Sequence, residues 1–100
     1  MIAKVYIKRK FKKDSEGQVV GILNKMRAAA MDQAGYISGE TLMSFDDPQT
    51  MTVIATWQNL DSWRKWKENQ QRKQMEAMLE VFQIGPTVYE EYIAGFTPKK

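Results

Sequence analysis

Four stretches of the chain have the composition of β-strands. They are rich in β-branched and aromatic residues, turn residues separate them, and they cover residues 2–11, 36–45, 51–57 and 87–96. Asp46-Asp47-Pro48-Gln49 separates the second stretch from the third, and these turn-forming residues predict a hairpin. The second and third strands should therefore pair antiparallel.

A helix is predicted between the first two strands. Apolar residues recur there at spacings of four, three and four, which places them on one helical face: Val19, Leu23, Met26 and Ala30. Ser15 precedes Gln18 by three residues, the spacing of a capping box, so the helix is expected to begin there. Gly35 is expected to end it, because glycine tolerates the left-handed conformation at a helix terminus.

A second helical region follows the third strand. Its apolar residues are Leu60, Trp63, Trp66, Met75, Met78, Leu79 and Phe82. Asn59 is expected to cap its start, and Gly85-Pro86 to end it. The polar residues 68–71 interrupt the apolar period, which predicts a kink or a short break. Its charged residues indicate a solvated face with helical ion pairs: Arg64, Lys65, Lys67, Glu68, Arg72, Lys73, Glu76 and Glu80.

The resulting β-α-β-β-α-β order predicts one ferredoxin-like α+β domain over residues 1–100. Right-handed crossovers would place both helices on the same face of a four-stranded antiparallel sheet. Yet large apolar residues occur at both parities of the strands: in the second strand, Ile37 and Met43 fall on one parity and Tyr36 and Leu42 on the other. Since the helices can cover only one face, we expect a homodimer in which the open faces pack together.

Composition excludes several kinds of chemistry. The chain has no cysteine and no histidine, so disulfides, thiolate metal sites and the commonest general base are absent. No cluster of carboxylates has the spacing of a metal cage, and we predict neither a metal nor another cofactor. No leader peptide and no apolar run of about 20 residues is visible, which favours a cytoplasmic protein without membrane contact.

The net charge of +3 is unevenly distributed along the chain. Six basic residues precede the first acidic one, Asp14, and such a block occurs in nucleic-acid footprints. Alternating lysines on the solvated rim of a strand explain the block more simply. The octapeptide at residues 50–57, which includes the third strand, also lacks the glycine and the aromatic pair that the RNA-recognition module uses to stack bases. These observations argue against a nucleic-acid partner.

The chain resembles the antibiotic biosynthesis monooxygenase family over nearly its whole length. The resemblance rests on Gly-Tyr-Ile-Ser-Gly-Glu at 35–40, the turn Asp46-Asp47-Pro48, and Ile54-Ala55-Thr56-Trp57 leading into Leu60-Asp61-Ser62-Trp63-Arg64-Lys65-Trp66. It implies a dimeric α+β barrel with a pocket between the sheet and the helices of each protomer. Oxygenase members of the family oxidise quinol-like or polycyclic aromatic molecules without metal or flavin, and relatives cleave haem.

The resemblance also suggests site residues. Trp66 matches a tryptophan that lines the pocket in both branches of the family, and the other candidates for substrate contact are Tyr6, Lys8, Tyr36 and Asn69. A tyrosine or lysine could stabilise an oxyanion, and a tryptophan could pack against an aromatic ring. As alternatives, Trp66 is a core aromatic that anchors its helix, and the two tyrosines are packing residues of the strands.

The same resemblance argues against haem degradation. The axial histidine of that branch lies ten residues after the pocket tryptophan, a position that Glu76 occupies here. A carboxylate replaces imidazole poorly on haem iron. The expected functions are therefore a cofactor-independent monooxygenase acting on a small aromatic molecule or, with the same fold, a non-catalytic dimeric binder or pathway accessory protein. No pair of residues forms a recognisable acid–base constellation, so the enzyme assignment rests on resemblance alone.

Overall fold

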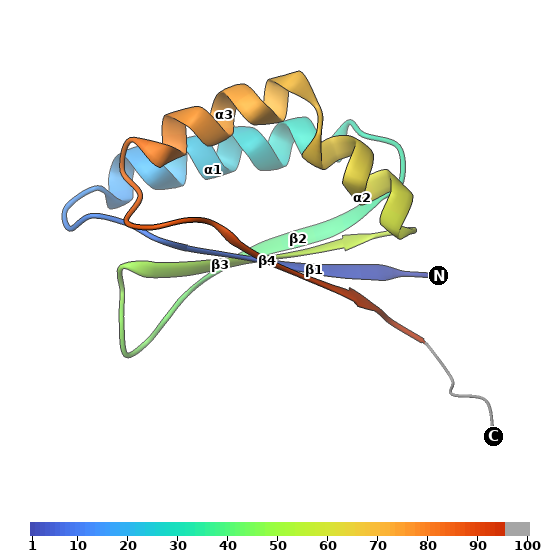
Figure 1. Ribbon diagram of the computed structural model, residues 1–100, viewed down its shortest axis with the longest axis horizontal. Coiled ribbons are helices and arrows are strands. Elements are labelled where there is room, and N and C mark those ends of the chain that lie inside the picture. Colours follow the sequence, from blue (N-terminus) through green and yellow to red (C-terminus); the bar gives the residue numbers. More distant parts are fainter. Residues whose placement is uncertain (96–100) are drawn as a thin grey trace.

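The computed structural model describes residues 1–95 and confirms the ferredoxin-like α+β fold. Its elements are β1 (Ala3–Lys10), α1 (Glu16–Met31), β2 (Tyr36–Met43), β3 (Thr50–Trp57), α2 (Leu60–Lys67), α3 (Gln70–Glu80) and β4 (Val88–Ile93). The strands form one antiparallel sheet in the order β2-β3-β1-β4, and the three helices lie on one side of it (Figure 1). The sheet of one chain is open, with β2 and β4 at its edges, and is not a closed barrel.

The core lies between the sheet and the helices. Val19, Leu23, Met26 and Ala30 of α1 are all buried, as their spacing predicts. Alternate residues of β1 meet them from the sheet, so the core joins elements that are distant in sequence. The largest side chains that are fully buried are Trp57, Trp63, Leu79, Val5 and Val19.

The first helix begins without the predicted capping box. The hydroxyl of Ser15 donates a hydrogen bond of 2.6 Å to the carbonyl oxygen of Lys12 and makes no side-chain cap. Ser15 occupies the N-cap position, so the predicted start of the helix is confirmed, but its side chain closes the turn after β1 and the predicted capping box is wrong. The backbone carbonyl of Ser15 still accepts the first helical hydrogen bond, from Val19 N at 3.0 Å.

Gly35 has a different role from the one predicted. The helix already ends at Met31, with Asp32 as its C-cap, so Gly35 does not terminate it. Gly35 instead has a φ of 88° in the turn that leads into β2. A side chain at this position would collide with Ser62 of α2 as well as strain the backbone. Gly35 thus allows the start of β2 to pass close to α2.

The second helical region is broken as predicted, and the break separates α2 from α3. Asn59 caps α2 by accepting a hydrogen bond of 2.8 Å from Ser62 N. Asn69 caps α3 by accepting one of 2.8 Å from Gln71 N. The helix ends at Glu80, five residues before Gly85, so its predicted end was too late.

The ends of the strands also differ from the prediction. β2 stops at Met43, and Phe45, which was assigned to it, is 96% exposed in the hairpin. Phe11 lies just beyond β1 and forms an isolated bridge with Gln83. β4 ends at Ile93, and the predicted last residue, Phe96, lies outside the described residues.

The sheet has a covered face, which packs against the helices, and an open face on the other side. On the covered face Val5 pairs with Ala55 and Glu91, and on the open face Tyr6 pairs with Ile54 and Glu90. The cross-strand register gives the open face as Lys4, Tyr6, Lys8, Lys10, Ser38, Glu40, Leu42, Thr50, Thr52, Ile54, Thr56, Val88, Glu90 and Tyr92. Within residues 1–95, no helix has the length and apolar character that crossing a membrane requires.

Candidate functional site

A cavity of about 50 Å³ lies between the covered face and the helices. Strands β1, β2 and β3 form its floor, and α1, α2 and the first turn of α3 form its roof. Its walls are Ile7, Arg9, Leu23, Met26, Arg27, Ala30, Tyr36, Gly39, Thr41, Val53, Ala55, Trp57, Trp63, Trp66 and Arg72. This list contains three arginines and no carboxylate.

Aromatic side chains form one side of this cavity. The ring of Tyr36 meets the ring of Trp57 edge to face, with centroids 5.3 Å apart. Trp63 lies against Trp57 at 6.3 Å, and Trp66 from the same helix is 4% exposed. Such walls suit a flat aromatic ligand, because rings pack favourably edge to face or offset.

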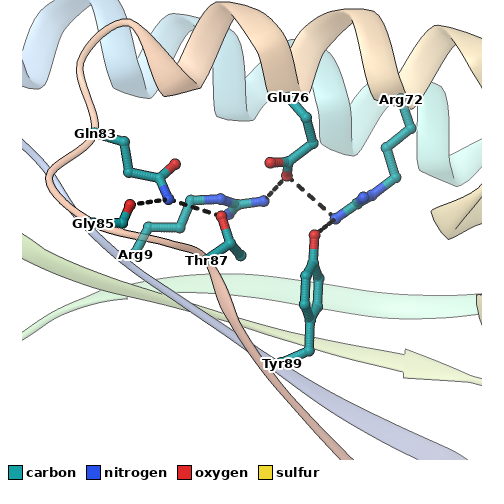
Figure 2. A network of polar contacts seen from close by, with 7 residues as sticks. All are labelled: Arg9, Arg72, Glu76, Gln83, Gly85, Thr87 and Tyr89. Atoms are coloured by element: carbon teal, nitrogen blue, oxygen red, sulfur yellow. Dashed lines mark hydrogen bonds and ion pairs between the residues drawn. The ribbon is translucent and has the colours of Figure 1, made fainter.

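A buried network of charges lies beside the aromatic wall, under α3 (Figure 2). Glu76 accepts hydrogen bonds from the guanidinium of Arg9 and, at 3.3 Å, from that of Arg72. Arg72 also donates to the Tyr89 hydroxyl at 3.1 Å and lies over the Trp63 ring at 5.2 Å. Two guanidinium groups thus face one carboxylate, and the network keeps one positive charge in excess.

Burial of this network corrects the prediction that these charges are solvated. Arg72 is 3% exposed, and Glu76, one helical turn further along α3, is also buried. Both lie on the face of α3 that contains Met75 and Leu79. Arg9 likewise shares the parity of Val5 and Ile7 on β1. Position on an apolar face was the signal that could have identified these residues from the sequence.

Two buried N–H groups of the wall residues lack a partner among the described residues. They are Nε of Arg9 and Nε1 of Trp57. Buried donors are satisfied in most proteins, and leaving one unpaired costs about 1–3 kcal/mol. A ligand with an acceptor oxygen would remove that cost, so these groups are candidate ligand contacts.

The mouth of the cavity lies between α1 and β2. There Arg27 Nη2 donates a hydrogen bond of 2.7 Å to Thr41 Oγ1. Burial raises the pKa of Tyr36, and the nearby charge of Arg27 opposes that shift in part. The Tyr36 phenol therefore remains protonated at neutral pH and can donate a hydrogen bond. Gly39 makes room for this hydroxyl, which would lie only 2.7 Å from a Cβ there.

The structure brings together two of the five predicted site residues. Trp66 and Tyr36 both line the cavity. Tyr6 and Lys8 lie on the open face of the sheet, where Lys8 forms an ion pair of 3.1 Å with Glu90. Asn69 caps α3 and does not line the cavity.

Trp63 also has a structural bond, at the edge of the sheet. Its indole N–H donates a hydrogen bond of 2.7 Å to Glu91 of β4, and Arg64 donates to the same carboxylate at 3.2 Å. Burial by itself would raise the pKa of Glu91, but the hydrogen bonds from Arg64 and Trp63 lower it. These bonds attach α2 to β4 and fix the roof of the cavity.

Within residues 1–95, no three acidic side chains come close enough to hold an ion. The Glu76 carboxylate is engaged by two arginines.

The chain is a ferredoxin-like α+β protein with a cavity between its sheet and its helices. The model of the antibiotic biosynthesis monooxygenase family matches residues 2–78, and the chain belongs to this family. No protein with a curated description matches the sequence.

Solved structures share the fold of this chain at low sequence identity. SnoaB, a cofactor-independent oxygenase from Streptomyces nogalater, has a TM-score of 0.81 at 14% identity, covering 100% of both chains. A conserved protein from Methanosarcina mazei has a TM-score of 0.86 at 14% identity, covering 92% of this chain and 91% of its own. A protein from Mycobacterium tuberculosis has a TM-score of 0.83 at 10% identity, covering 99% and 100%.

Proposed function

We propose that this protein is a cofactor-independent monooxygenase that acts on a quinol-like or polycyclic aromatic molecule. The observation that supports this most directly is the composition of the cavity wall. It combines aromatic rings packed edge to face or tilted, three arginines and two unpaired N–H groups, and it contains no carboxylate. Such a wall favours an aromatic ligand in its deprotonated form.

The reaction needs no reductant other than the substrate. A ring CH₂ group that is conjugated with a ketone through fused aromatic rings, as in anthrone, loses a proton to solvent at the cavity mouth and becomes an enolate, which donates electrons to O₂. The carbon gains one oxygen atom, and the other oxygen leaves as water with both hydrogens of the CH₂ group. The balance is R₂CH₂ + O₂ → R₂C=O + H₂O.

The chain would contribute binding, orientation and electrostatic stabilisation. In this proposal Trp66 packs against the ring, and the free Nε–H of Arg9 receives the enolate oxygen. Trp57 lies six residues further along the sheet, opposite Ala3, so its free N–H is available to a second acceptor of the ligand. The Tyr36 hydroxyl adds a donor at the mouth. Donors fixed in a dry site lower the energy of a developing oxyanion without having to reorganise during the reaction.

Oxygen uptake with anthrone as the substrate tests the function. Trp66→Ala should lower the enzyme-dependent rate by at least about tenfold, and Trp66→Phe should keep most of it, because an aromatic ring still lines the wall. The rate of spontaneous anthrone oxidation is subtracted, and circular dichroism verifies the fold of each variant. If Trp66→Ala keeps the full rate while folded, this role of Trp66 is excluded.

The alternative is a non-catalytic binder or pathway accessory protein. The small volume of the cavity favours it, since about 50 Å³ does not admit a polycyclic molecule without opening. Binding of aromatic anions without any oxygen uptake over a panel of oxidisable ketones would favour this alternative.

We also propose that the open face forms a homodimer. Five large side chains with apolar surface lie there: Tyr6, Leu42, Ile54, Val88 and Tyr92. Leu42, Val88 and Tyr92 are each about half exposed in the single chain. Full burial of such a side chain contributes roughly 1.5–3 kcal/mol, and two copies would each contribute. In this arrangement Tyr6 and Lys8 belong to the interface.

A further inference from the structure

The cavity beside Trp66 is too small for the ligand that its walls suit. Its volume of about 50 Å³ accommodates a few water molecules, whereas sites for small organic molecules measure roughly 300–1,000 Å³. A ligand of several rings therefore needs additional space. The geometry of the cavity mouth shows where that space lies.

A groove of about 290 Å³ adjoins the cavity, between α1 and β2. Its apolar walls are Val20 of α1, Met43 of β2 and Met51 of β3. Leu23, Arg27 and Thr41 line the groove as well as the cavity. The two spaces are thus neighbours that share a wall.

The shared wall contains one polar bridge. It is the 2.7 Å hydrogen bond from Arg27 to Thr41, which joins α1 to β2 and is exposed to solvent. Water competes for both partners of an exposed hydrogen bond, so such a bond adds little net stability. Arg27 has no carboxylate partner among the ion pairs of the described residues. Its guanidinium is therefore available to a ligand anion that displaces Thr41.

Charge indicates the kind of ligand. Neither the cavity nor the groove has an aspartate or glutamate in its wall, and Arg27 lies where they meet. Arg9 and Arg72 add the excess positive charge of the buried network on the α3 side of the cavity. An elongated apolar molecule with one anionic group matches this distribution.

We propose that the cavity and the groove form one composite ligand site, divided by the Arg27–Thr41 hydrogen bond. The ligand is an extended aromatic anion that exchanges Thr41 for its own oxygen on Arg27, enters the cavity with one end and lies along Val20 and Met43 with the other. This proposal rests on the proposed function for the role of the inner cavity. It makes Arg27 a specificity-determining residue and Thr41 part of the entrance.

Binding of anthracene-2-carboxylate, followed by its fluorescence anisotropy, tests the groove. Val20→Asp adds a negative charge to the wall and should raise the Kd by about tenfold. Ala28→Asp is the matched control, because it adds the same charge to an exposed position of α1 outside the groove. Val20 is 42% exposed, so both variants should fold. Equal Kd values for the two variants would overturn the groove as part of the site.

Two further measurements test the bridge and the charge. Thr41→Val removes the acceptor of Arg27 and should increase the association rate of anthracene-2-carboxylate by about two- to tenfold. An unchanged rate would refute the dividing role of the bridge.

The neutral analogue 2-(hydroxymethyl)anthracene should bind at least about tenfold more weakly than the carboxylate, and Arg27→Met should reduce this preference. Equal binding of the two compounds would refute an anionic ligand.

These binding assays contain no oxidisable substrate, so they separate the two proposals. Groove-dependent binding of the carboxylate, together with no oxygen uptake in the separate assay with anthrone, would support the composite site and contradict the monooxygenase function. Oxygen uptake that depends on Trp66 but not on Val20 or Thr41 would support the function and refute the composite site.

Discussion

The two faces of the sheet use charged residues of the same strand in opposite ways. On the covered face, Arg9 is 4% exposed and shares the Glu76 carboxylate with Arg72. On the open face, the neighbouring Lys8 pairs with Glu90, and both side chains remain more than one third exposed. One residue of displacement along β1 therefore changes an ion pair from solvated to buried.

The energetic difference between the two ion pairs follows from their solvation. Water solvates each charge of an exposed ion pair whether or not the other charge is present. Such a pair therefore contributes only about 0–1 kcal/mol to the free energy of unfolding. A buried arginine loses its hydration and must have compensating partners, which makes its surroundings sensitive to small changes. Arg9 has such partners for one end of its guanidinium but none for Nε. The covered face thus keeps a free buried donor, which is the feature expected of a binding site.

The largest effect should come from the carboxylate that holds the buried network. Glu76→Gln leaves two buried guanidinium groups without their counter-charge, and we expect the free energy of unfolding to fall by roughly 3–5 kcal/mol. Glu90→Gln, which removes the equivalent charge on the open face, should lower it by less than about 1 kcal/mol in the single chain, where the pair with Lys8 is exposed. Both substitutions are therefore compared in the Ile54→Lys background, which keeps the open face solvated. Urea denaturation at pH 7 measures both variants. Similar losses would show that the two faces do not differ as described.

Arg9 should matter for ligand binding as well as for stability. Arg9→Met removes the free Nε donor, and we expect enzyme-dependent oxygen uptake with anthrone to fall by about 100-fold. Lys10→Met is the control, since Lys10 follows Arg9 on β1 but lies on the open face, and it should change the rate by less than about twofold. If the two variants have the same rate while folded, Arg9 does not contact the substrate. Arg9→Lys keeps the positive charge but lacks the Nε–H group, so it separates the effect of this donor from the effect of the charge.

Disruption of the open face should change assembly and leave the fold intact. Ile54→Lys places a charge in the middle of the proposed interface, and we expect it to weaken association by about 2 kcal/mol per dimer. Light scattering over a range of concentrations should then show the 11.6 kDa single chain at concentrations where the unmodified protein is dimeric. A unit of 11.6 kDa for the unmodified protein at every micromolar concentration would contradict the dimer.

The smallest effect concerns the bond between α2 and β4. Because the folded state lowers the pKa of Glu91, this carboxylate contributes stability at a pH above its unfolded pKa of about 4.3 and loses the contribution as the pH falls through the folded value. Glu91→Gln should therefore be less stable by about 1 kcal/mol at pH 7. The difference should vanish towards pH 3, as measured by urea denaturation at each pH. A difference that persists at pH 3 would assign the effect to something other than the charge of Glu91.

Much of the fold could be predicted from local patterns. The core face of α1, the hairpin at residues 46–49 and the cap at Asn59 depend on neighbours a few residues away, and all are present. The break near Asn69 was predicted for the same reason. The predictions for the Ser15 side chain and for Gly35 were wrong because both assumed a role at an end of α1. Ser15 instead makes a contact within a turn, and Gly35 makes a contact with a distant helix. Ser15 bonds to Lys12, and Gly35 makes room for Ser62.

The candidate site was predicted only in part. Trp66 and Tyr36 line the cavity, whereas Arg9, Arg27 and Arg72 were missed as members of its wall. Arg9 was counted in a basic block, and Arg72 in a solvated helical face. Arg9 falls in the alternating series of buried residues of β1, and Arg72 lies on the buried face of α3, so both positions indicate burial. A buried arginine can be predicted only when its partner is known, and that partner, Glu76, is distant from Arg9 in the sequence.

The sequence by itself determined the order of the elements, the buried face of α1 and the family, because these depend on periodicity and on local motifs. The tertiary structure decided which charges are buried together, since Arg9, Arg72 and Glu76 come from β1 and α3 and meet only after the crossover brings α3 over the sheet. It also decided which tyrosine reaches the cavity, because Tyr6 and Tyr36 have similar strand surroundings but lie on opposite faces. Side-chain chemistry is encoded locally, whereas the electrostatic environment that gives it a function arises from contacts between distant segments.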